Sequence, residues 1–155
     1  MSDNTADERI VWIDHDDKRI DNDSGLQIFV EGASTVGDSY GKYEEKMTLK
    51  ILKFNSIVVS LGGGSFMNKV IRKEVLKNHI SFWLNWNNEI LLNRIKNSKK
   101  RPLAFNATEN ELIDLIKKRS NIYSKALYEI KCDKISKSEV VKKVLNNYET
   151  YQIKN

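Results

Sequence analysis

Residues 56–78, SIVVSLGGGSFMNKVIRKEVLKN, decide the fold. The run Ser56–Leu61 is rich in β-branched residues and stops at three glycines, which is typical of a buried strand in a parallel sheet. The residues after the glycines predict an amphipathic helix. Its apolar face is expected to hold Val70, Ile71, Val75 and Leu76. A strand, a glycine turn and a helix in succession are the repeating unit of an α/β sheet.

The same alternation extends in both directions along the chain. Further strands are predicted at 9–14, 26–31, 80–84 and 128–132, and further helices at 40–53, 88–97, 109–127 and 139–151. Thr108 with Glu111, and Ser136 with Glu139, have the spacing of capping boxes that open the last two helices. Short connections between strands and helices predict one domain, residues 1–155, with a parallel sheet flanked by helices.

Composition places the chain among globular proteins. Hydrophobic residues make up 40% and charged residues 30% of its 155 residues. The single cysteine, Cys132, excludes an internal disulfide and fits a reducing compartment. The polar start, MSDNTADER, is unlike a signal peptide, and no apolar run has the length of a membrane span. A cytoplasmic location with no membrane partner is therefore expected.

Charge is distributed unevenly. Residues 1–31 hold nine acidic and three basic side chains, whereas residues 32–155 hold twelve acidic and twenty-three basic ones. A basic body favours an anionic partner. Nucleic acid is disfavoured because no binding signature appears and aromatic residues do not interleave with the basic runs. We expect a small anionic ligand held by a few arginines, and a monomeric protein.

Four features point to the chemistry of such a ligand. Gly62–Gly64 follow a strand at the sheet edge where α/β proteins bind ligands, and glycines let backbone N–H groups approach a ligand closely. The alternative is a flexible turn between strand and helix. Arg94, Arg101 and Arg119 carry the planar, permanently charged fork that suits carboxylate and phosphate. Each arginine alone is more simply explained as a solvated surface residue.

These residues resemble the shikimate kinase family. The family pattern is a strand running into GGG, then an arginine on a helix, then R-P-L in a basic loop, then R-x-x-x-Y. Here it is found in VVSLGGG, in LLNRIKNSKKRPLA and in LIDLIKKRSNIYSKA. The resemblance covers about residues 42–148 and leaves 1–41 as a divergent N-terminal part, with a lid loop at about 98–107.

The resemblance implies a P-loop phosphotransferase that moves the γ-phosphate of ATP to shikimate with Mg²⁺, in aromatic amino-acid (chorismate) biosynthesis. Gly62, Gly63 and Gly64 match the triplet that contacts shikimate, and Arg119 matches the arginine that holds its carboxylate. Arg101 matches the catalytic lid arginine, which also binds nucleotide. Arg94 matches an arginine that packs against adenine.

Upstream, the resemblance implies a D-x-D motif after the family's second strand. WIDHDD supplies Asp14, on the magnesium side, and Asp16, which would hold shikimate hydroxyls and help deprotonate one. An alignment on Ile20 and Gly25 favours Asp17 instead. The family's F-R-x-x-E falls on Gly41–Glu45, so its substrate-binding arginine is replaced by Lys42, which keeps the charge and loses the bidentate fork.

A phosphate loop is the feature that the family pattern requires and this sequence does not show. The family places G-x-x-x-x-G-K-[ST] before the D-x-D, where MSDNTADERIVW has no glycine and no lysine. The stretch VEGASTVGDSY (30–40) has the right frame, but Asp38 occupies the lysine position and would repel phosphate. We interpret it as an ordinary turn, and a substitute phosphate loop is the alternative.

Three functions follow as hypotheses. The first is a shikimate kinase-like enzyme with activity impaired by the missing loop. The second is a non-catalytic shikimate-binding protein that has lost nucleotide binding. The third is a structural or interaction domain in which the glycines and arginines are relics. Without the family's first strand, either Arg9–Asp14 or the strand at 26–31 must fill the middle of the sheet, or the chain associates with something that does, because unpaired backbone groups in a core are costly.

Overall fold

A computed structural model describes the chain except residues 1–8, 15–26, 31–37, 55–56, 98–106 and 155. The described elements, in chain order, are β1 (Arg9–Asp14), β2 (Gln27–Val30), α1 (Asp38–Ile51), β3 (Ile57–Leu61), the short 3₁₀ helix η1 (Ser65–Met67), α2 (Lys69–Asn78), β4 (Ile80–Asn85), α3 (Asn88–Lys96), α4 (Glu109–Tyr123), β5 (Tyr128–Lys131) and α5 (Lys137–Lys154). The predicted alternation of strands and helices is confirmed.

The five strands form one sheet in the order β2-β3-β1-β4-β5, and every neighbouring pair is parallel. This arrangement confirms the predicted α/β class. β1 occupies the centre, with Ile13 opposite Leu61 of β3 on one side and opposite Trp83 of β4 on the other. Arg9–Asp14 therefore fills the middle of the sheet, and its backbone groups are satisfied within the ladder.

The place of β1 differs from one expectation. The resemblance places the D-x-D motif after the second strand, but Asp14 is the last residue of the first and central strand. The physical reason is that a parallel sheet needs a fully paired strand at its centre, and Arg9–Asp14 takes that position. Asp16 and Asp17 lie outside the described residues.

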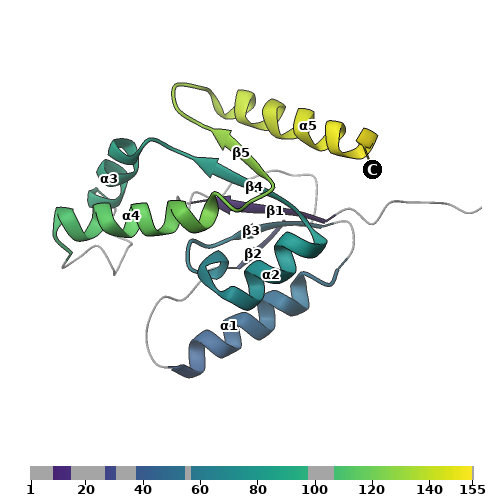
Figure 1. Cartoon of the computed structure of the whole chain (residues 1–155), viewed down its shortest axis with the longest axis horizontal. Coiled ribbons are helices and arrows are strands. Elements are labelled where there is room, and N and C mark those ends of the chain that lie inside the picture. Colours follow the sequence, from purple (N-terminus) through teal and green to yellow (C-terminus); the bar gives the residue numbers. More distant parts are fainter. Residues whose placement is uncertain (1–8, 15–26, 31–37, 55–56, 98–106, 155) are drawn as a thin grey trace, which may run out of the picture.

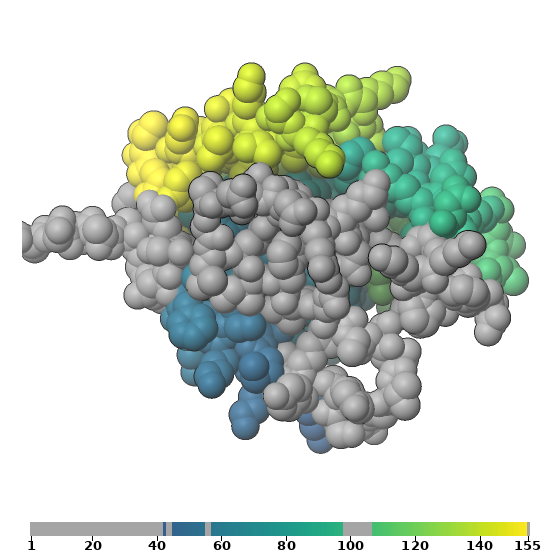
Figure 2. All heavy atoms as spheres, turned by 180° about the vertical axis from the view of Figure 1, so that it is seen from behind, coloured from purple at the N-terminus to yellow at the C-terminus, as the bar shows by residue number. Residues whose placement is uncertain are grey.

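Both faces of the sheet are covered. β3 and one side of β4 pack against α1, α2 and α4 through a core that includes Val59, Trp83 and Tyr123. The other side of β4 packs against α5 through Phe82 and Val144. Figure 1 shows α1 and α2 on one side of the sheet and α5 on the other. In the space-filling view of Figure 2, the blue residues of α1 and the yellow residues of α5 lie on opposite margins of the molecule.

The buried apolar face of α2 is narrower than the sequence predicted. In α2, Ile71 and Val75 are buried, but Val70 and Leu76 are 50% and 43% exposed. Val70 directly precedes Ile71, and Leu76 directly follows Val75. One position is about 100° around a helix, so both exposed residues lie beside the buried stripe.

The end of α4 also differs from the prediction. α4 ends at Tyr123, four residues earlier than predicted, because the chain turns there to bring the Leu127 N–H onto the Ser81 hydroxyl, 2.9 Å away.

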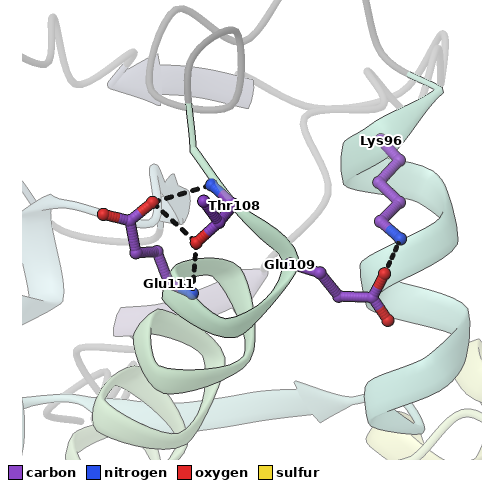
Figure 3. Close-up of polar contacts among 4 residues, drawn as sticks. All are labelled: Lys96, Thr108, Glu109 and Glu111. Carbon is purple, nitrogen blue, oxygen red and sulfur yellow. Dashed lines mark hydrogen bonds and ion pairs between the residues drawn. The ribbon is translucent and has the colours of Figure 1, made fainter.

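Both predicted capping boxes are formed. At the start of α4, the Thr108 hydroxyl accepts from the Glu111 N–H, and the Glu111 carboxylate accepts from the Thr108 N–H at 2.7 Å (Figure 3). Next to this box, Lys96 of α3 forms an ion pair with Glu109 of α4. At the start of α5, Glu139 makes the equivalent bond to the Ser136 N–H, also at 2.7 Å. These contacts set where each helix begins.

The capping box of α4 makes stability depend on pH. Hydrogen bonds from the Thr108 backbone and then from its side chain hold the pKa of Glu111 below its ordinary value. Because the pKa is lowered in the folded state, the contribution is present at neutral pH and is lost as the pH falls through the acidic range. We expect Glu111→Ala to lower the thermal midpoint at pH 7, and the two midpoints to converge as the pH falls through the acidic range and Glu111 of the wild type becomes protonated. Glu149→Ala, an exposed glutamate of α5, is the control and should show no such convergence; parallel curves for both variants would contradict the account.

Candidate functional site

The candidate site lies where the parallel strands end. Because all strands run in one direction, Val30, Leu61 and Asp14 finish at the same edge of the sheet, and Gly62–Gly64 follow directly after Leu61. Open α/β sheets bind ligands outside this edge. The structure thus places the glycine turn and Asp14 on the predicted side of the sheet.

Gly63 is held by α4. A Cβ built on Gly63 would lie 3.0 Å from Nη1 of Arg119 and 3.2 Å from the Tyr123 hydroxyl oxygen. The Tyr123 hydroxyl also donates a hydrogen bond to the Gly63 carbonyl. A side chain here would be tight against α4, so the Arg119 or Tyr123 side chain would have to shift by a few tenths of an ångström to make room. The same contacts place the Arg119 guanidinium against the glycine turn.

Gly64 has a different environment. A Cβ on this residue would meet no atom of the described residues within 4 Å, and its backbone has φ −83° and ψ −36°, which any residue adopts. Neither packing nor backbone conformation requires glycine at this position. The flexible turn that the sequence analysis gave as the alternative therefore stays open beside a ligand-binding role. Glycine there leaves the backbone open on the outer side of the turn, as close approach of a ligand requires.

The segment after the turn is fixed by polar contacts. Nη1 of Arg72 donates to the carbonyls of Phe66 and Met67 at 3.0 and 2.9 Å. Asn68 caps α2 by accepting from the Val70 N–H, and its amide donates to Glu45 of α1 at 2.7 Å. Sequence reasoning did not identify these supports. The sequence could have indicated Asn68 as the N-cap of a helix. It could not have indicated the bond from Asn68 to Glu45, which is 23 residues away in the chain.

The other predicted site residues lie elsewhere or outside the description. Lys42 is in the first turns of α1 with an exposed side chain. The guanidinium of Arg94 lies over the ring of Trp86, with its Cζ 4.0 Å from the ring centroid. Arg101 and the rest of the predicted lid, 98–106, lie outside the described residues, as does Asp16. Of the predicted residues, the structure brings together Gly63 and Arg119.

The sequence that follows the central strand lacks the phosphate-loop motif expected for a nucleoside triphosphate. That motif is glycine-rich and has a lysine followed by Ser or Thr. The sequence after β1 reads HDDKRIDND, which has no glycine, four aspartates and a lysine that is followed by arginine. Within the described part of the chain, no group of three or more His, Cys, Asp and Glu side chains is placed to hold a metal, and no helix has the length and apolarity to cross a membrane. Asp14, which the sequence analysis placed on the magnesium side, is the last residue of β1, and its role toward Mg²⁺ stays a prediction.

Comparison with known proteins gives a consistent result. A family model described as shikimate kinase matches residues 9–149. A shikimate kinase of Bartonella quintana is 34% identical over 109 residues, which cover 70% of this chain and 52% of that protein. The chain thus spans about half the length of this curated relative.

Solved structures agree on the fold. Shikimate kinase from Aquifex aeolicus superimposes with a TM-score of 0.63 at 30% identity, covering 77% of this chain and 70% of that one. Shikimate kinase from Acinetobacter baumannii in complex with shikimate superimposes with a TM-score of 0.64 at 24% identity, covering 74% and 66%. At that identity, the second likeness concerns the fold alone.

The two neighbouring glycines should respond differently to the same substitution. We expect Gly63→Ala to destabilise the protein by about 1–3 kcal/mol, because the new methyl group presses on Arg119 and on the buried Tyr123. Gly64→Ala should be neutral or stabilising by about 0.4–1 kcal/mol, because it restricts only the unfolded chain. Urea denaturation of both variants measures this difference. An equal loss of stability would mean that the turn itself requires both glycines.

Proposed function

The chain belongs to the shikimate kinase family, and on that premise we propose that it binds shikimate at the glycine turn after β3. The observation that carries the proposal is the contrast between two glycines of the turn. Gly63 packs closely against α4, whereas no described residue packs against Gly64, so the packing of the described residues does not explain a glycine there. The solved relative bound to shikimate supports the choice of ligand through its fold.

Arg119 supplies the charge for such a ligand. Its guanidinium lies beside Gly63, in the last two turns of α4, and the side chain is partly buried. A guanidinium offers donors in a planar fork that matches a carboxylate in two parallel hydrogen bonds. Partial burial strengthens such a pair relative to one in bulk water. We infer that Arg119 binds the shikimate carboxylate while backbone donors of the turn face its hydroxyl groups.

Phosphoryl transfer is a separate matter. Transfer of a γ-phosphate depends on positioning and on neutralising the charge of the phosphates. In this chain the central strand leads into an acidic segment, which repels phosphate. We infer that the chain retains shikimate recognition and transfers phosphate slowly or not at all. The nucleotide roles of Arg94 and Arg101, the magnesium role of Asp14, and the roles of Asp16 and Lys42 toward shikimate stay predictions.

Shikimate binding is tested by calorimetry on Arg119 variants. Arg119→Ala should weaken binding by about 1.5–3 kcal/mol, the cost of losing a charge-assisted hydrogen bond. Arg119→Lys should fall between this variant and the wild type, because it keeps the charge without the fork. Lys118→Ala is the control, since it removes one positive charge from an exposed neighbour on the same helix. No heat from the wild type with millimolar shikimate, or an equal loss in the Lys118 variant, would refute the assignment.

Turnover is tested by a coupled assay of ADP release with shikimate and Mg-ATP. We expect a rate far below the range of about 1–100 per second that is usual for kinases. The Asp38→Lys variant should turn over no faster than the wild type. Asp38 begins α1, and the exchange raises the local charge by two units at a helix N-terminus, which disfavours cations. A wild-type rate within the usual range would show that another segment builds a phosphate cradle.

A further inference from the structure

We propose that Tyr123 is a positioning residue, whose hydroxyl fixes the peptide between Gly63 and Gly64 so that the Gly64 N–H faces the ligand. The proposal rests on the proposed shikimate site and names the device that shapes it. Tyr123 itself is not expected to touch the ligand, because its side chain is fully buried.

Each carbonyl of the glycine turn has its own hydrogen-bond donor. The Gly62 carbonyl accepts from the Ser65 N–H at 3.0 Å, and the Gly64 carbonyl accepts from the Met67 N–H, also at 3.0 Å. These two bonds are local and come from the backbone of η1. The Gly63 carbonyl accepts from the Tyr123 hydroxyl, 60 residues away. The middle peptide of the turn therefore depends on a side chain of α4.

A peptide between two glycines is the easiest in a protein to flip. Rotation of the peptide plane needs large changes in the dihedrals on both sides, and two residues without Cβ atoms allow them. Because the peptide is trans, its C=O and N–H point in opposite directions. Holding the Gly63 carbonyl toward Tyr123 therefore directs the Gly64 N–H away from the Tyr123 hydroxyl. A flipped peptide would present a carbonyl there instead.

The ring of Tyr123 is held in place independently of its hydroxyl. It makes edge-on contacts with Phe66, at a centroid distance of 6.1 Å, and with Trp83, at 6.4 Å. The ring is thus part of the core between β4 and the glycine turn. Tyr123→Phe should keep this packing and remove the hydroxyl that donates to the Gly63 carbonyl. That variant separates positioning of the peptide from the general packing of the core.

The test combines calorimetry with shikimate and spectra of the free protein. We expect Tyr123→Phe to raise the Kd for shikimate about tenfold, a loss of one hydrogen bond to a ligand of this kind. Tyr148→Phe is the matched control, because it too removes a tyrosine hydroxyl with a hydrogen-bond partner; the Tyr148 hydroxyl accepts from the side-chain amide of Gln152 on α5. It should leave the Kd unchanged. A Kd within twofold of the wild type in the Tyr123 variant would overturn the proposal.

A second readout does not need the ligand. With ¹⁵N label on glycine only, the seven glycines give seven amide signals, and Gly64→Ala identifies one of them. Tyr123→Phe should shift the Gly64 signal of the free protein more than any signal outside the turn, whereas Tyr148→Phe should not. An unmoved Gly64 signal would refute the positioning role, as would a Tyr123→Phe protein that fails to fold. If the wild type does not bind shikimate, the proposed function fails and the spectra still decide this inference.

Discussion

The contact between α4 and Gly63 is the constraint on which the candidate site depends. Arg119 and Tyr123 are one helical turn apart, so both meet the same glycine from the same face of α4. The absence of a side chain on Gly63 lets the helix approach the end of β3, and this approach places a guanidinium beside an open backbone. The packing of α4 and the proposed recognition of shikimate therefore share one contact, and we expect a change at Gly63 to affect both.

Hydrogen bonds next to the glycine turn also connect it to α1 and α2. Asn68 joins the start of α2 to Glu45 of α1, and Arg72 holds the carbonyls of η1. Each of these contacts satisfies backbone or carboxylate groups near the sheet edge, so the turn is fixed from three helices at once. A rigid turn is what a small ligand with a carboxylate and hydroxyl groups needs, because donors that are already in place lose little entropy on binding.

Local patterns in the sequence predicted local structure well. The apolar runs at 57–61 and 80–84 became buried strands, and the two capping boxes begin the helices that they were expected to begin. The long-range contacts could not be predicted in this way. Tyr123 was visible as part of R-x-x-x-Y, but its bond to Gly63 spans 60 residues. The sequence also left two strands as candidates for the centre of the sheet, since both are short apolar runs, and only their pairing decided between them.

The most direct test of the account is a titration of the glycine-labelled wild type with shikimate. If the glycine turn is the binding site, the signals of Gly62, Gly63 and Gly64 should move together and give one Kd. Gly25, Gly32, Gly37 and Gly41 should follow less or not at all. Shifts confined to these four glycines, or no shift at millimolar shikimate, would contradict the claim that the turn after β3 holds the ligand.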